Sequence, residues 1–187
     1  VKYNTHTPLA KTDFTSAKAA AEWLAENAKN KAFRLVAKKV SEHLNNTSLT
    51  VVEALAEAPA YVRAQYAGKL LGSAALFSDG TVEVTIAGWK PSAMTEENLL
   101  HELVHAATMS KLASGGPAAK AFADMAAVVK RELGTWNGAF PINDARQRDV
   151  ANFFKSNNIF GDPAEFVAYV FSSPSMQEVM GLMASDG

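Results

Sequence analysis

The chain contains no cysteine among its 187 residues. This absence excludes disulfide frameworks, thiolate zinc fingers, iron–sulfur clusters and cysteine nucleophiles. It leaves the compartment open, because a chain without cysteine tolerates both reducing and oxidising surroundings. A chain of this length buries roughly 70% of the surface that its unfolded form exposes. We therefore expect one domain over residues 1–187 that needs no structural metal, so that any bound metal would serve chemistry.

An excess of charge and a long apolar run are also missing. The formal net charge is -1, which removes the broad attraction that sequence-independent nucleic-acid binding requires, and we expect no nucleic-acid partner. The longest uncharged run, Phe166–Gln177, contains Pro174 and falls short of the roughly 18 residues of a membrane span. The chain starts at Val1 without a signal-peptide pattern. We expect a soluble protein with no membrane partner, and a piece excised from something longer.

The periodicity of apolar residues predicts strands in the first half of the chain only. A long amphipathic helix is expected from Thr15 to about Leu44, with a break near Asn27–Asn30. Leu49–Val52 resembles a strand, and Tyr61–Tyr66 fits either a strand or a helix end. The next two strands, Ala74–Phe77 and Thr81–Ile86, flank an Asp79-Gly80 turn typical of a hairpin.

The second half of the chain has helical periodicity throughout, so the predicted fold class is α+β. Glycine- and proline-containing segments separate five expected helices. These helices cover Thr95–Leu112, Pro117–Leu133, Asn143–Ser156, Pro163–Phe171 and Ser175–Met183.

The helix expected from Thr95 carries His101-Glu102-Leu103-Val104-His105, an HExxH motif. Residues four apart on a helix differ by about 40° in direction, so both imidazoles leave one face and can bind a single ion. Glu102 lies about 60° from His105 and can reach a metal-bound water as a general base without being a ligand. With 4 histidines in the chain, the motif would arise by chance in about 0.5% of such sequences. The alternative is two histidines on a purely structural helix.

Residues 101–108, with Asp162–Ala168 and Ser173–Gln177 downstream, resemble the zincin metallopeptidase domains found in phage and prophage virion proteins and other large polyvalent proteins. The resemblance spans roughly Thr81 to Met180. It implies a compact zincin-like fold, a Zn²⁺ cofactor, a protein or peptide substrate, and a place in the virion or the host cytoplasm. In gluzincins a downstream glutamate is the third zinc ligand, so the resemblance gives that role to Glu165.

The third ligand can also be weighed from the residues themselves. The metzincin pattern is excluded, because Thr108 and Lys111 stand where that class has glycine and histidine. Acidic residues on following helices remain. Asp124 has a spacing closer to that of classical gluzincins, whereas Glu165 lies on an apolar helix where a carboxylate is costly unless paired or metal-bound. The three acidic candidates are Asp124, Glu132 and Glu165.

Glu165 has a second interpretation, and Tyr169 departs from the family pattern. With Asp162 as N-cap and Pro163 as the first helical residue, Glu165 completes a capping box. The family usually carries an acidic residue at the position of Tyr169. One turn after Glu165, the Tyr169 hydroxyl could donate to an oxyanion or to substrate, and a packed core tyrosine is the alternative.

The sequence therefore predicts a zinc metallopeptidase in which His101, His105 and Glu165 bind Zn²⁺ and Glu102 is the general base. We expect the strand Thr81–Ile86 to run beside the motif helix and to hold an extended peptide along its free edge. One alternative is a catalytically silent zincin-fold structural or interaction module of a phage virion protein. The other is a helical DNA-binding or packaging domain, which the charge balance does not support.

Overall fold

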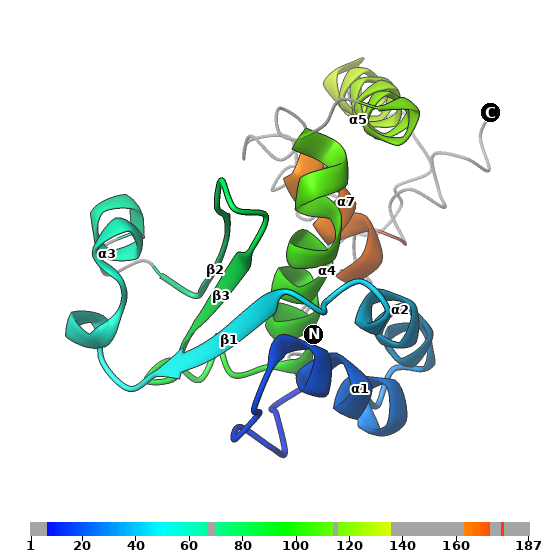
Figure 1. Ribbon diagram of the computed structural model, residues 1–187. Helices are drawn as coiled ribbons and strands as arrows, with labels where there is room; N and C mark the ends of the chain where they lie inside the picture. The colour runs from blue at the N-terminus through cyan, green and yellow to red at the C-terminus, as the bar shows by residue number, and fades with distance from the viewer. Residues whose placement is uncertain (1–6, 67–69, 114–115, 136–162, 173–176, 178–187) are drawn as a thin grey trace. The chain divides into compact units, whose positions relative to one another are not determined.

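The computed structural model describes residues 7–66, 70–113, 116–135, 163–172 and 177 (Figure 1). Contacts group the chain into two compact units, one of residues 6–110 and the other of residues 111–187 with 1–5. The strands that the structure describes all lie in the first unit, whereas the described elements entirely within the second are helices. The α+β fold class is confirmed. The single domain over residues 1–187 stays a prediction.

Two helices, α1 (Ala17–Asn27) and α2 (Lys31–Ser41), stand where one long broken helix was expected. Each begins at a residue whose side chain accepts a hydrogen bond from a first-turn amide, Ser16 at 3.0 Å and Asn30 at 2.8 Å. Such caps pair amides that a helix start leaves without a partner, so a second helix can begin directly after Asn30. The predicted break at Asn27–Asn30 is confirmed. The two helices pack against each other.

Three strands form a mixed sheet in the order β1-β3-β2 (Figure 1). The central strand β3 (Val82–Ala87) pairs in parallel with β1 (Thr47–Val52) and antiparallel with β2 (Gly72–Leu76). Both edges of β3 are thus occupied. The prediction that Thr81–Ile86 offers a free edge to a peptide is wrong, because β1 pairs in parallel with the side of β3 that the hairpin leaves open.

The turn between β2 and β3 is the predicted hairpin. Gly80 has a φ of 87°, a backbone conformation that favours glycine. The carboxylate of Asp79 accepts hydrogen bonds from the amide of Thr81 at 3.0 Å and from its hydroxyl at 2.6 Å. These local contacts close the turn, and the predicted hairpin is confirmed.

The two faces of the sheet meet different helices. On one face lie Val84 and Ile86 of β3, both 1% exposed, together with Gly72, which pairs with Ile86. On the other face, Glu83 accepts a 2.8 Å hydrogen bond from the hydroxyl of Tyr61. Tyr61 belongs to α3 (Ala60–Tyr66), which follows the short 3₁₀ helix Leu55–Glu57, so this ambiguous segment is a helix.

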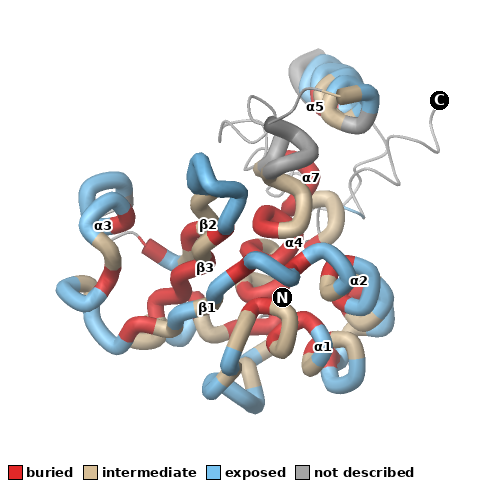
Figure 2. Tube along the Cα trace, in the orientation of Figure 1, coloured by how far each residue is buried: buried red, intermediate tan, exposed pale blue. Residues whose placement is uncertain are grey.

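The motif helix is α4 (Glu96–Ala113), anchored at its start. The hydroxyl of Thr95 accepts a 3.1 Å hydrogen bond from the amide of Asn98. A chain segment from the N-terminal region pairs with the residues before α4, because the amide of Leu9 donates to the carbonyl of Met94 at 3.0 Å. Figure 2 shows the buried stretch that follows along α4. Its members, each at most 1% exposed, are Leu99, Leu100, Leu103 and Val104.

In the second unit, α5 (Pro117–Thr135) and α7 (Pro163–Ser172) pack against each other. Phe166, Val167 and Ala168 of α7 are fully buried. The expected helices at 143–156 and 175–183 fall outside the described residues, save for residue 177. Among the described helices, none combines the length and the apolar character that a bilayer crossing requires.

Candidate metal centre

The two histidines of the HExxH motif lie side by side on α4, one turn apart. Their ring centroids are 4.8 Å apart and their ring planes meet at 78°. His105 is buried at 6% exposure, and His101 is half-buried. As helix geometry predicts for residues four apart, the two imidazoles project from one face of α4.

Buried residues and side-chain hydrogen bonds of α4 hold the two histidines in place. The leucines and Val104 on its other faces are buried. The hydroxyl of Thr108 donates to the backbone carbonyl of Val104 at 2.7 Å. The amide group of Asn98 donates to the carbonyl of Ala93 at 2.9 Å. Thr108 thus bonds to backbone within α4 and Asn98 to backbone just before it, and the buried residues of α4 fix the direction in which it presents the histidines.

Glu102 turns toward the sheet. It is buried at 6% exposure. Its side chain lies against Gly72 of β2 so closely that a Cβ atom on the glycine would be 2.7 Å from Glu102 Cγ and 3.0 Å from its Oε1. The carboxylate of Glu102 therefore lies between α4 and an edge strand, in the same unit as the two histidines.

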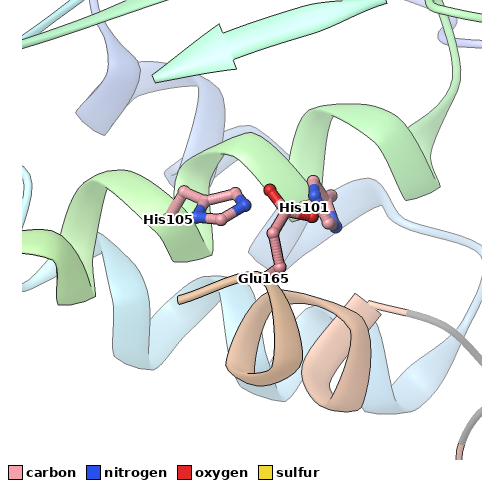
Figure 3. A group of neighbouring side chains, drawn as sticks. All are labelled: His101, His105 and Glu165. Carbon is pink, nitrogen blue, oxygen red and sulfur yellow. The ribbon is translucent and has the colours of Figure 1, made fainter. Parts of the chain in front are cut away.

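Glu165 completes a cluster of possible metal ligands with the two histidines (Figure 3). It lies in the first turn of α7 and is half-buried. One ligand atom from each of His101, His105 and Glu165 lies within 4.8 Å of the other two. Glu102 is not a member of this cluster. Two imidazoles and one carboxylate form a donor set found in catalytic zinc sites, which keep their fourth position open, so these residues fit Zn²⁺.

The other acidic candidates are placed differently. The carboxylate of Asp124 on α5 is 63% exposed and forms an ion pair with Lys120, one turn away on the same helix. The side chain of Glu132 lies outside the described part of the chain, as does Asp162, the expected N-cap of α7. Among described residues, the histidine pair therefore clusters with Glu165 and not with Asp124. Tyr169 is half-buried one turn after Glu165, and its role stays a prediction.

No protein family, curated protein or solved structure matches this chain. The function is therefore inferred from the chemistry of the residues themselves. The sequence indicated both histidines, Glu102 and Glu165. It did not point to Gly72, because a glycine beside a short strand is typical of a turn. Only the structure shows that Gly72 lies against the side chain of Glu102.

Proposed function

We propose that this protein is a zinc-dependent metallopeptidase of the zincin type. The observation that carries the proposal is the pair of adjacent imidazoles on α4 with the carboxylate of Glu102 on the same turn, turned toward an edge strand. His101 and His105 would bind the ion, and Glu165 supplies the carboxylate that makes three protein ligands. The absence of cysteine leaves this nitrogen and oxygen donor set as the natural one for the chain.

When bound, Zn²⁺ would act as a Lewis acid on the substrate carbonyl and would lower the pKa of a water molecule at its open position. The chain's own base is Glu102. Its carboxylate takes a proton from the water molecule as the water oxygen bonds to the carbonyl carbon, and delivers that proton to the nitrogen of the leaving amine. The bond between the carbonyl carbon and that nitrogen then breaks. The products are a carboxylic acid and an amine.

The free edge of β2 is the part of the described sheet best suited to hold an extended peptide. The carbonyl of Leu71 accepts from the amide of Ala87 at 3.0 Å, and the amide of Phe77 donates to the carbonyl of Thr81 at 2.9 Å. Since hydrogen-bonded pairs alternate along an antiparallel ladder, the backbone groups of the even-numbered residues of β2 face away from β3.

Three residues of β2 thus present amides and carbonyls along this edge, namely Gly72, Ala74 and Leu76. No strand among those described pairs with it. A peptide added there as a further strand would run past the Glu102 carboxylate, which lies against Gly72. We therefore assign substrate binding to β2 in place of β3.

Hydrolysis of a labelled, unfolded protein such as casein tests the proposal. Zinc-loaded wild type is compared with Glu102→Gln, which keeps the shape of the side chain and removes the base. We expect the variant to retain zinc and to lose about 10² to 10⁴-fold in rate, the range that general acid–base catalysis supplies. Equal rates in the two proteins would refute the role of Glu102. One bound zinc with no cleavage of casein or of a diverse peptide library would favour a catalytically silent zincin-fold module.

A further inference from the structure

We infer that Gly72 is a positioning residue for Glu102, and that the lack of a side chain at this strand position determines where the base carboxylate lies. The inference rests on the proposed function for its consequence in turnover, but its structural part stands on contacts within one unit of the chain. A Cβ atom at Gly72 would lie 2.7 Å from Cγ, 3.0 Å from Cδ and 3.0 Å from Oε1 of Glu102.

The backbone of Gly72 does not by itself require glycine. Gly80 has a positive φ and Gly72 has none, so alanine at residue 72 meets no conformational penalty of that kind. The constraint is the space that the Glu102 side chain occupies. A side-chain carbon under 3.0 Å from a new Cβ atom must move, because carbon atoms in van der Waals contact are about 3.5 to 4.0 Å apart.

Neither backbone can easily give way. β2 is paired with β3 from Gly72 to Leu76, and α4 is packed through Leu99, Leu103 and Val104, each at most 1% exposed. The predicted contact begins at Cγ, in the middle of the glutamate side chain, so relief requires the whole carboxylate to swing away. The three atoms nearest to such a Cβ atom all belong to Glu102, and none belongs to His101 or His105. Gly72 therefore acts first on the base.

Gly88, the residue directly after β3, provides a control beside the same sheet. A Cβ atom there would lie 2.7 Å from Cγ1 of Val51 and 2.9 Å from the carbonyl oxygen of Val52. A new Cβ atom would be crowded at both glycines, but at Gly88 the nearest atoms belong to the side chain and backbone of β1 and none belongs to Glu102. Gly88→Ala should therefore reduce stability without a selective effect on the base.

The test is a double-mutant cycle on the full zinc-loaded chain, read by urea unfolding in the absence of substrate. Gly72→Ala should lower the unfolding midpoint when Glu102 is present. The same substitution should have little effect in the Glu102→Ala background, because Cγ, Cδ and the carboxylate oxygens are then gone. Gly88→Ala should lower the midpoint equally in both backgrounds. An equal loss from Gly72→Ala in both backgrounds would overturn the inference, and so would no loss in either.

Casein hydrolysis gives a measurement that a purely structural role of Gly72 would leave unchanged. Gly72→Ala should keep one zinc and nearly the wild-type KM, and lose about 10²-fold in kcat, the cost of misplacing a catalytic group by about 1 Å. Gly88→Ala should keep its kcat. An unchanged kcat in Gly72→Ala would overturn the inference. If wild type cleaves nothing, the proposed function fails, but the unfolding cycle still decides whether Gly72 places Glu102. If Gly72→Ala does not fold, recovery of folding by Glu102→Ala supports the inference, and no recovery refutes it.

Discussion

The imidazole rings of His101 and His105 lie 4.8 Å apart on successive turns of α4. One nitrogen of each ring and one carboxylate oxygen of Glu165 lie within 4.8 Å of one another. Because catalytic zinc sites have three protein ligands, removing either imidazole would leave the proposed site with too few donors for tight binding.

The first prediction is that the purified protein binds close to one equivalent of zinc. His101→Ala and His105→Ala should each lose it, as measured by elemental analysis after dialysis against zinc-free buffer. His43→Ala is the control, since His43 is exposed beyond the end of α2. Stoichiometric zinc in the double variant His101→Ala/His105→Ala would contradict the assignment of the site.

A second prediction separates the third-ligand candidates. Glu165→Gln replaces a charged oxygen donor with a neutral amide, so zinc affinity should drop by at least about tenfold, as measured by competition with a chromophoric chelator. Asp124→Asn should leave affinity within about threefold, because the carboxylate of Asp124 is exposed and paired with Lys120. If Asp124→Asn were the variant that loses zinc, Glu165 would be only a helix-start residue and the proposed role of Tyr169 would fall with it.

Metal removal should leave the protein folded. The first unit has a buried core that includes Leu24, Phe33, Leu44 and Ile86, none of which belongs to the proposed site. We expect the chelator-treated protein to keep its far-ultraviolet circular dichroism and a cooperative thermal transition. Its Tm should be lower than that of the zinc-loaded form, because an ion that binds only the folded state stabilises it. Loss of structure on chelation would instead indicate a structural metal site.

A fourth prediction concerns the buried carboxyl group at the start of α4. Glu96 is 3% exposed. Burial, with the neighbouring Glu97 charge adding to it, raises the pKa of Glu96, although the amide of Lys29 donates to its carboxylate at 3.1 Å and opposes the shift. A folded-state pKa above the unfolded value stabilises the protein below the unfolded pKa. This contribution is lost as pH rises through the folded pKa.

Glu96→Gln removes that titration. We therefore expect the free energy of unfolding of the variant, minus that of wild type, to be larger at pH 7 than at pH 4. Urea unfolding of both proteins at both pH values measures this difference. A difference between variant and wild type that does not change with pH would contradict the prediction.

The sequence alone determined the features that depend on neighbours a few residues apart. Asn30 starts α2 through an amide two residues later, and Asp79 with Gly80 closes the hairpin within its own turn. The pairing of His101 with His105 is of the same kind, because a helix brings residues four apart onto one face whatever surrounds it. Such local geometry is encoded in residue type and spacing.

Tertiary structure decided the features that depend on contacts between distant residues. The strand-or-helix ambiguity of Tyr61–Tyr66 ends in a helix whose Tyr61 hydroxyl bonds to Glu83 across 22 positions. β1 pairs in parallel with β3, so β3 has no free edge. The strand with a free edge next to Glu102 is therefore β2 and not β3. The contact of the Glu102 side chain with Gly72 connects a helix to a strand some 30 residues earlier in the chain. Periodicity reports only which face of an element is apolar, so it cannot name the partner that covers that face.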